Sequence, residues 1–165
     1  MPSTVLKLFT DNNAKIDQKI LEDDTFQIDF EELSSHQAKY LCIITSGHLE
    51  KSLQDIGTKY KTDGGISGCA KFLGNMRNPK WCNVLSYLVN IDARLISALD
   101  YKVTNKEQIK NHLDMLSTAR NNIAHGKTAE ITIHDMDGII QSVDKLIKSI
   151  KEIVEHHISE IESSI

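Results

Sequence analysis

Residues 139–161 read IIQSVDKLIKSIKEIVEHHISEI, and no other part of the chain says as much about its fold class. Apolar residues recur there at steps of three and four, with Lys, Glu, Asp and Ser between them. This spacing places them on one face of a helix, which we expect to run from about Ile133 to Glu162. The apolar positions are Ile139, Ile140, Val143, Leu146, Ile147, Ile150, Ile153, Val154, Ile158 and Ile161.

The segment before this helix has the same pattern and ends before Gly126. Its apolar face comprises Ile109, Leu113, Leu116, Ala119 and Ile123. Thr132 with Asp135, and Thr104 with Glu107, have the spacing of a capping box, in which two side chains bind the first backbone amides of a helix. The sequence therefore predicts a penultimate helix, a short polar connection and a long last helix.

Further helices are expected upstream of residue 104. Apolar spacing predicts a long helix from about Glu31 to Tyr60, with Leu41, Ile44, Leu49, Leu53, Ile56 and Tyr60 facing inward. Asn78-Pro79 predicts an N-cap followed by Pro at the first helical position. The core face of the helix that follows would be Leu85, Leu88, Leu95 and Leu99.

The remaining segments give weaker signals. Residues 1–22 have a helical pattern, and a shorter helix is expected over about 66–76. Residues 26–30 alternate like a strand or an extended packing arm. We expect one domain overall, with an N-terminal helix and arm over 1–30 and a helical bundle over 31–165. The fold class is all-α, an up-and-down bundle of about five to six helices.

Composition narrows the class of protein. Aromatic residues make up only 5% of the 165 residues and hydrophobic residues 40%, as in bundles whose core is aliphatic. No apolar run approaches the roughly 18 residues of a membrane span, and the N-terminus lacks the features of a signal peptide. We expect a cytoplasmic protein. The cysteines Cys42, Cys69 and Cys82 are widely spaced, which argues against a disulfide framework or a zinc site and predicts buried thiols.

Chemistry-bearing residues are concentrated in Arg120-Asn121-Asn122-Ile123-Ala124-His125-Gly126, at the predicted end of the penultimate helix. Arg offers a permanently charged fork that fits phosphate oxygens, and His exchanges a proton near neutral pH. These groups suit ribonuclease chemistry without a metal. They also suit helix capping, with Gly126 at C′, His125 favouring the helix dipole and Arg120 bonding the last carbonyls.

The motif resembles the R-N-x-x-x-H signature of HEPN-domain proteins, which are helical ribonucleases of toxin–antitoxin and antiphage systems. The resemblance implies a HEPN-like fold and a homodimer that places two motifs across one cleft. In that arrangement His125 would move protons, Arg120 would stabilise charge on the phosphorane, and Asn121 would orient the phosphate. No metal or cofactor is required, and a nucleotidyltransferase-fold antitoxin is a candidate partner. The motif-level match covers only residues 120–126.

Spacing within the motif raises a geometric question. Positions i and i+5 of a regular helix are about 140° apart, so Arg120 and His125 would not converge on one phosphate from an intact helix. Either the last turn unwinds at Gly126, or a second copy of the chain completes the site.

RNA binding would need local positive charge, because the formal net charge is −4. Lys127 and Asn122 are the candidate RNA-binding residues, with Arg77 and Lys80 contributing if their loop folds nearby. On the long helix of residues 31–60, Glu50 is a supporting candidate, since a polar residue on an earlier helix assists the Arg-His pair in some HEPN proteins.

Two other groups of residues give weaker evidence of a functional site. Residues 64–68 are glycine-rich but lack the strand and the Lys-Ser/Thr of a phosphate loop, so we expect an interhelical turn. His156 and His157 lie about 100° apart on a helix and are poorly placed to share a metal, so we expect them at the surface or in an interface. Two rival functions remain open: a non-catalytic helical dimerisation or adaptor module, and a nucleotide-binding HEPN module.

Overall fold

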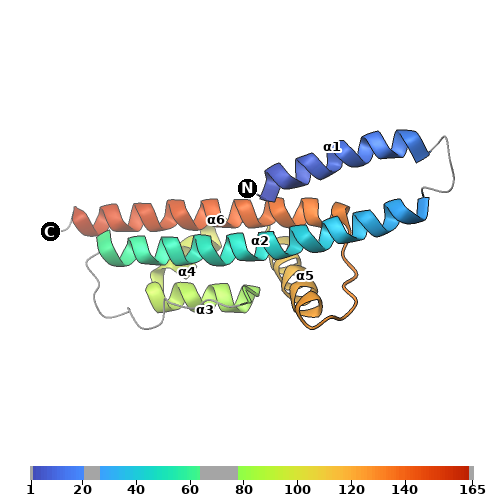
Figure 1. The fold of residues 1–165 in the computed structure, drawn as a ribbon. Helices are drawn as coiled ribbons and strands as arrows, with labels where there is room; N and C mark the ends of the chain where they lie inside the picture. Colours follow the sequence, from blue (N-terminus) through green and yellow to red (C-terminus); the bar gives the residue numbers. More distant parts are fainter. Residues whose placement is uncertain (1, 21–26, 64–77, 164–165) are drawn as a thin grey trace.

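The fold was obtained as a computed structural model, which describes residues 2–20, 27–63 and 78–163 (Figure 1). Over these residues it consists of six helices and contains no strand, which confirms the all-α prediction. The helices are α1 (Pro2–Ile20), α2 (Gln27–Asp63), α3 (Trp81–Ile91), α4 (Arg94–Lys102), α5 (Lys106–Ala124) and α6 (Ile133–Glu162).

Two long helices form the frame of the molecule. α2 and α6 lie side by side over most of their length, and α1 packs against both (Figure 1). On the opposite side, α5 contacts both long helices, α4 contacts α6, and α3 contacts α4 and α5. The predicted apolar face of α6 is buried from Ile139 to Ile158. Removing that continuous face from water drives the packing of the bundle.

The start of α6 has the predicted capping box. The Thr132 hydroxyl accepts the Asp135 backbone N–H at 3.0 Å, and the Asp135 carboxylate accepts the Thr132 backbone N–H at 3.0 Å. Hydrogen bonds from the Thr132 side chain and backbone lower the pKa of Asp135. The second predicted box is wrong, because α5 begins one residue later, with Asn105 at the N-cap, and Glu107 pairs with Lys110 instead.

The helix predicted after Asn78-Pro79 differs in two ways. It begins at Trp81 with Lys80 at the N-cap, so Asn78 is not the cap. It is also two helices, because the chain becomes extended at Asp92 and resumes as α4. The Asp92 carboxylate accepts the Arg94 backbone N–H at 2.9 Å, which substitutes for the helical hydrogen bonding lost at the break.

The N-terminal predictions have mixed outcomes. Residues 2–20 are helical as expected, but the strand or arm over 26–30 is wrong, because residues 27–30 form the first turn of α2. Phe30, Ser34 and Ala38 follow at steps of four and lead into the buried Leu41 on one helix face, so the short alternation has little weight against it. The turn at 64–68 and the helix at 66–76 lie outside the described residues.

Cysteine burial was predicted correctly at one of the two described positions. Cys42 is buried, whereas Cys82 is exposed on α3; Cys69 lies outside the described residues. In the part of the chain that the structure describes, no helix is long and apolar enough to cross a membrane.

Candidate functional site

The motif occupies the C-terminal turn of α5, which ends in a Schellman turn. Gly126 has φ +65°, the left-handed conformation that glycine adopts without strain. Its N–H donates to the Ile123 carbonyl at 3.1 Å, and the Lys127 N–H donates to the Asn122 carbonyl at 2.8 Å. The carbonyls of Asn121, Asn122 and Ile123, near the end of α5, are therefore satisfied by the backbone itself.

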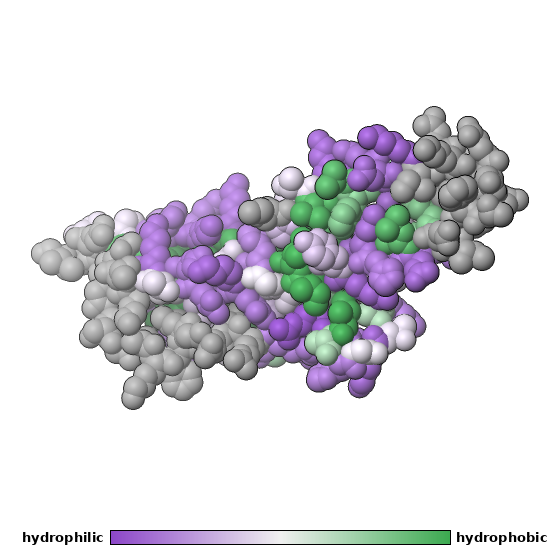
Figure 2. All heavy atoms as spheres, viewed as in Figure 1, coloured by the Kyte–Doolittle hydropathy of each residue, from purple (hydrophilic) through white to green (hydrophobic). Residues whose placement is uncertain are grey.

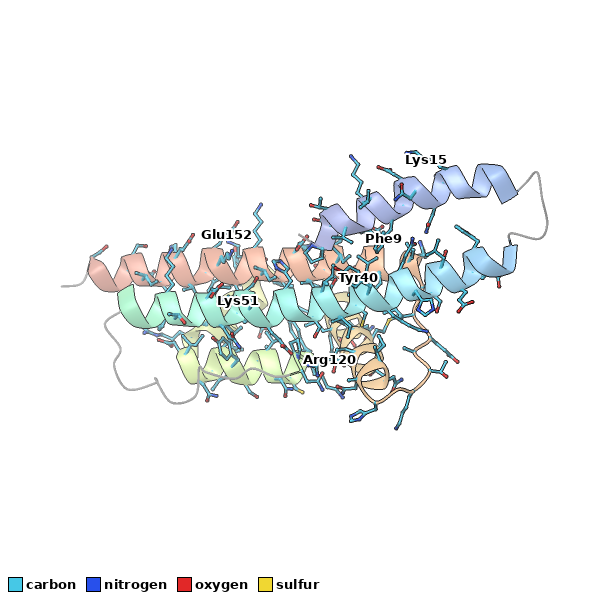
Figure 3. All side chains as sticks on the ribbon, viewed as in Figure 1. Phe9, Lys15, Tyr40, Lys51, Arg120 and Glu152 are labelled. Carbon is cyan, nitrogen blue, oxygen red and sulfur yellow. The ribbon has the colours of Figure 1, made fainter. Side chains whose placement is uncertain are left out.

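Arg120 is half-buried on the side of α5 that faces α2 (Figure 3). Its charge acts on Cys42 of α2, whose thiol donates to the Leu116 carbonyl at 3.6 Å. Burial raises the pKa of Cys42 to about 11, and the Arg120 charge opposes that rise. The guanidinium thus lies at the junction of α2 and α5.

The other motif side chains lie closer to solvent. His125 is exposed, and Asn121 and Asn122 are half-buried. None of the side chains of Arg120, Asn121, Asn122 and His125 makes a hydrogen bond or ion pair with any residue that the structure describes. If Arg120 capped the helix, its side chain would donate to the last carbonyls of α5. Those of Asn121, Asn122 and Ile123 already accept backbone N–H groups.

Arg120 and His125 do not converge within one chain. α5 remains helical through Ala124, and the His125 N–H still donates to the Asn121 carbonyl at 3.1 Å. The chain turns only at Gly126, after both residues. Their separation of about 140° around the helix axis is therefore retained.

Glu50 is connected to the motif helix indirectly, through Asn78. Its carboxylate accepts the Asn78 backbone N–H at 2.9 Å, and the Ser117 hydroxyl donates to the Asn78 side-chain carbonyl. Asn78 has φ +61°, a conformation that Asn tolerates better than most residues. Through Asn78, Glu50 thus holds the segment before α3 against α2 and α5. It makes no hydrogen bond or ion pair with the motif in the described part of the chain.

Ser117 was not singled out in the sequence, and Asn78 was singled out only as an N-cap. The two residues that form this hydrogen bond are 39 positions apart in the sequence, so no local spacing predicts it. His48, the other polar residue on this part of α2, pairs with Asp144 of α6 at 3.6 Å and not with the motif.

Positive charge near the motif is sparse. Lys127 is exposed immediately after Gly126, and Lys80 is half-buried two residues beyond Asn78. Arg77 lies outside the described residues. No group of three or more His, Cys, Asp or Glu side chains in the described ranges is arranged to hold a metal ion.

A pocket of about 710 Å³ adjoins the motif, between α5 and the connection to α6. Asn122 lines it, together with Asp114, Met115 and Thr118 from α5 and Glu130 and Ile131 from the connection. Asp114, Thr118 and Asn122 follow one another at four-residue steps, so the sequence places them on one helix face. The opposite wall of the pocket, residues 128–131, depends on how the connection folds, and the sequence there has no comparable spacing that would predict it.

A second polar cluster lies where α3, α4 and the end of α6 meet. The Asp92 carboxylate accepts from the Tyr60 hydroxyl at 3.2 Å, lies 3.1 Å from His157 Nε2 and pairs with Arg94 at 2.6 Å. The His157 ring also stacks on Tyr60, with ring centroids 5.9 Å apart. The expectation that His157 lies at the surface is therefore wrong.

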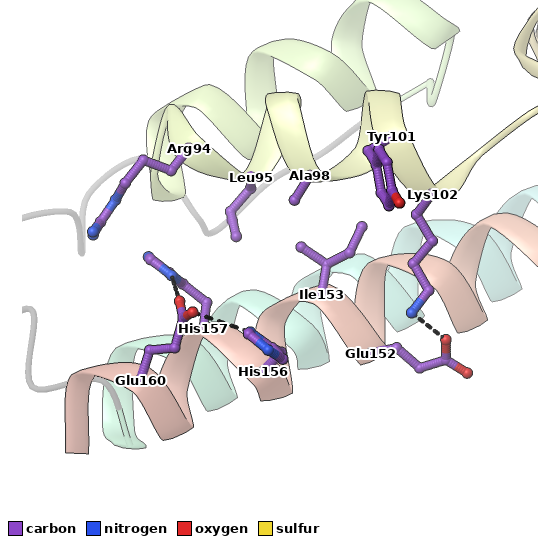
Figure 4. Close-up of a pocket in the computed structure, with 10 residues that line it drawn as sticks. All are labelled: Arg94, Leu95, Ala98, Tyr101, Lys102, Glu152, Ile153, His156, His157 and Glu160. Atoms are coloured by element: carbon purple, nitrogen blue, oxygen red, sulfur yellow. Dashed lines mark hydrogen bonds and ion pairs between the residues drawn. The ribbon is translucent and has the colours of Figure 1, made fainter. Parts of the chain in front are cut away.

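A groove of about 900 Å³ runs beside this cluster, between α4 and α6 (Figure 4). Most of its charged side chains are already paired, among them Lys102 with Glu152 at 2.6 Å and His156 with Glu160 at 3.6 Å. His156 is exposed, as expected. The cluster and the groove edge hold α4 against α6, so they serve the fold.

Comparison with known proteins extends beyond the motif. A family model described as RiboL-PSP-HEPN matches residues 8–156. This match takes in most of α1, which the resemblance of residues 120–126 had not covered. No curated protein and no solved structure was found to match the chain.

Proposed function

The chain belongs to the RiboL-PSP-HEPN family, and on that premise we propose that it is a metal-independent endoribonuclease. The observation that carries the proposal is the state of the motif at the end of α5. The fold leaves the polar groups of Arg120, Asn121, Asn122 and His125 without partners among the described residues. Polar groups whose hydrogen-bonding capacity the fold leaves unused are available to a ligand.

The proposed reaction is the attack of a ribose 2′-hydroxyl on the adjacent phosphate. One imidazole takes the proton from the 2′-hydroxyl, and a second protonates the departing 5′-oxygen. Arg120 stabilises the charge that grows on the phosphorane, and Asn121 orients the phosphate. Lys127 and Asn122 contact the RNA beside it. The products are a 2′,3′-cyclic phosphate and a free 5′-hydroxyl.

A homodimer supplies the second imidazole in this proposal. Because Arg120 and His125 diverge on one helix, a two-fold axis near the end of α5 is the simplest way to bring both groups to one phosphate. The two copies of His125 then perform the two proton transfers.

Exposed apolar residues on α1 and α2 support such a dimer. Leu33, Tyr40 and Ile43 on α2 and Leu8 on α1 are all exposed by 41% or more. Figure 2 shows apolar surface gathered over α1, α2 and α5 on one face of the molecule. Ile43 follows Cys42, which lies against α5, so this face borders the motif helix. A second copy would cover it.

The proposed setting is a toxin–antitoxin or antiphage system, with RNA as substrate and a nucleotidyltransferase-fold protein as the antitoxin. A free endoribonuclease harms its own cell, so a partner that covers the cleft is part of this proposal.

The test is cleavage of single-stranded RNA and of DNA of the same sequence, each in the presence of EDTA. We expect RNA to be cut and DNA to remain intact, because DNA lacks the 2′-hydroxyl nucleophile. Equal cutting of both, or loss of activity on chelation, would contradict the mechanism. Tight binding of a nucleotide without any cleavage would favour a nucleotide-binding module.

A further inference from the structure

The pocket beside the motif has the size of a small-molecule site. Its volume of about 710 Å³ lies within the usual range of roughly 300–1,000 Å³. Asn122 lines the pocket and also belongs to the motif. A group that enters the pocket therefore lies on the Asn122 side of α5, near His125, which follows three residues later.

The pocket carries two carboxylates, whereas a site that binds phosphate is usually positively charged. Asp114 is half-buried on α5, and Glu130 is exposed on the facing connection. Neither carboxylate has a hydrogen bond or ion pair with another described residue. Two ionised carboxylates repel a phosphate and accept hydrogen bonds. The group that fits is uncharged and rich in N–H donors.

The remaining surface of the pocket suits a flat ring. Met115 is 41% exposed beside Asp114, and Ile131 supplies a buried apolar side chain across the pocket. A thioether makes favourable contacts with aromatic rings. A ligand that is flat, uncharged and bears N–H groups has the properties of a nucleobase.

We propose that this pocket binds a guanine base of the RNA substrate, next to the phosphate that is cleaved. Guanine alone presents two adjacent N–H donors, N1–H and N2–H, which one carboxylate can accept together. Uracil presents a single N–H between two carbonyl acceptors, and these face the carboxylates unfavourably. Asp114 makes the paired contact, since it projects from a helix, and Glu130 assists from the connection. The inference rests on the proposed ribonuclease function for its substrate.

The first experiment measures binding without cleavage. Oligonucleotides of 2′-O-methyl uridine, with a single guanosine, adenosine or cytidine at the centre, lack the nucleophile and cannot be cut. We expect the wild-type protein to bind the guanosine oligonucleotide about tenfold or more tightly than all-uridine, as a bidentate base contact provides. Equal binding of guanosine and uridine overturns the inference.

The second experiment changes the carboxylate. Asp114→Asn replaces a pure acceptor by a group that both donates and accepts, as the bidentate reading of adenine requires. We expect the preference to move from guanosine to adenosine. Asp11→Asn, an exposed carboxylate on α1, is the matched control and keeps the wild-type preference. An unchanged preference in a folded Asp114→Asn protein overturns the role of Asp114.

Cleavage mapping separates this inference from the proposed function. Cutting next to guanosine in unmodified RNA is the expected result. Cutting without regard to the neighbouring base overturns the pocket and leaves the ribonuclease proposal intact. Guanosine-selective binding of the 2′-O-methyl oligonucleotides without cutting of unmodified RNA supports the pocket and contradicts the ribonuclease. Binding of a lysine-rich peptide in the pocket, with no base preference, assigns it to a protein partner and overturns the inference.

Discussion

The imidazole of His125 is exposed at the end of α5, and no packing in the described part of the chain depends on it. We expect His125→Ala to abolish RNA cleavage. A cationic residue at a helix C-terminus contributes at most about 1 kcal/mol, so the free energy of unfolding should change little. Thermal melts measured beside RNA cleavage assays check both parts.

Core truncations provide the comparison for that substitution. Leu116 and Ile150 are buried, with 0% and 1% of their surface exposed. Leu116→Ala and Ile150→Ala should each lower the free energy of unfolding by roughly 2–5 kcal/mol. If His125→Ala destabilised the protein as much as these two, His125 would be a structural residue and the site would be misassigned.

At this scale, sequence reasoning succeeds where a residue's role depends on its close neighbours. The spacing to Gly126 predicted that Arg120 and His125 end a helix, and the Schellman turn confirms it. Asn78 was misread as an N-cap because its partners, Glu50 and Ser117, come from helices distant in the sequence. No local pattern carries that information.

The break between α3 and α4 depends on an ionised carboxylate. Hydrogen bonds from the Arg94 side chain, with a further one from His157, hold the pKa of Asp92 well below its ordinary value of 3.8. The native state therefore loses this proton more readily than the unfolded chain does. Asp92 stabilises the fold above about pH 4, and this contribution is lost as the pH falls through the lowered pKa.

We expect Asp92→Asn to lower the free energy of unfolding by about 1–2 kcal/mol at pH 7, because charge-assisted hydrogen bonds become neutral ones. The difference from wild type should shrink as the pH falls below about 4, where the unfolded wild-type chain takes up the proton that the native Asp92 carboxylate still lacks. Urea unfolding at pH 7, 4 and 3 measures it. Asp100→Asn on α4 is the control, since the exposed pair of Asp100 with Lys106 of α5 contributes under about 1 kcal/mol. A difference independent of pH would contradict this assignment.

Whole helices were predicted best where one face is long and regularly apolar. The α6 pattern and its capping box were read correctly from the sequence. α3 and α4 were read as one helix, because Leu85, Leu88, Leu95 and Leu99 keep a helical spacing across the break. The imidazole of His157 contacts Asp92 at the break, but the two residues are 65 positions apart in the sequence. Only the tertiary structure therefore reveals this contact.

A shared site makes activity depend on both copies of His125. In random mixtures of equal amounts of wild-type and His125→Ala subunits, only dimers with two wild-type copies would cut. We expect about a quarter of full activity, against about a half for independent sites. Co-expression and assay at matched total protein distinguish the two values. Activity near a half would exclude the shared site.

Charge placed on the apolar face should separate the dimer. Ile43 is 43% exposed on α2, beside the residue that lies against α5, and Ile43→Glu puts a carboxylate into the proposed contact. We expect loss of both the dimer and cleavage, with thermal stability retained. Val89→Glu, at a position 50% exposed on α3, is the matched control. Equal effects of the two substitutions would show that Ile43 is not at the interface.

The length of α2 affects how any such dimer is measured. Its 37 residues extend over about 55 Å, whereas a compact chain of this size would be about 40 Å across. The monomer is therefore a rod that experiences more friction than a sphere of equal mass. In gel filtration it would elute early and imitate a dimer. The mass should be determined by light scattering or sedimentation equilibrium, which do not depend on shape.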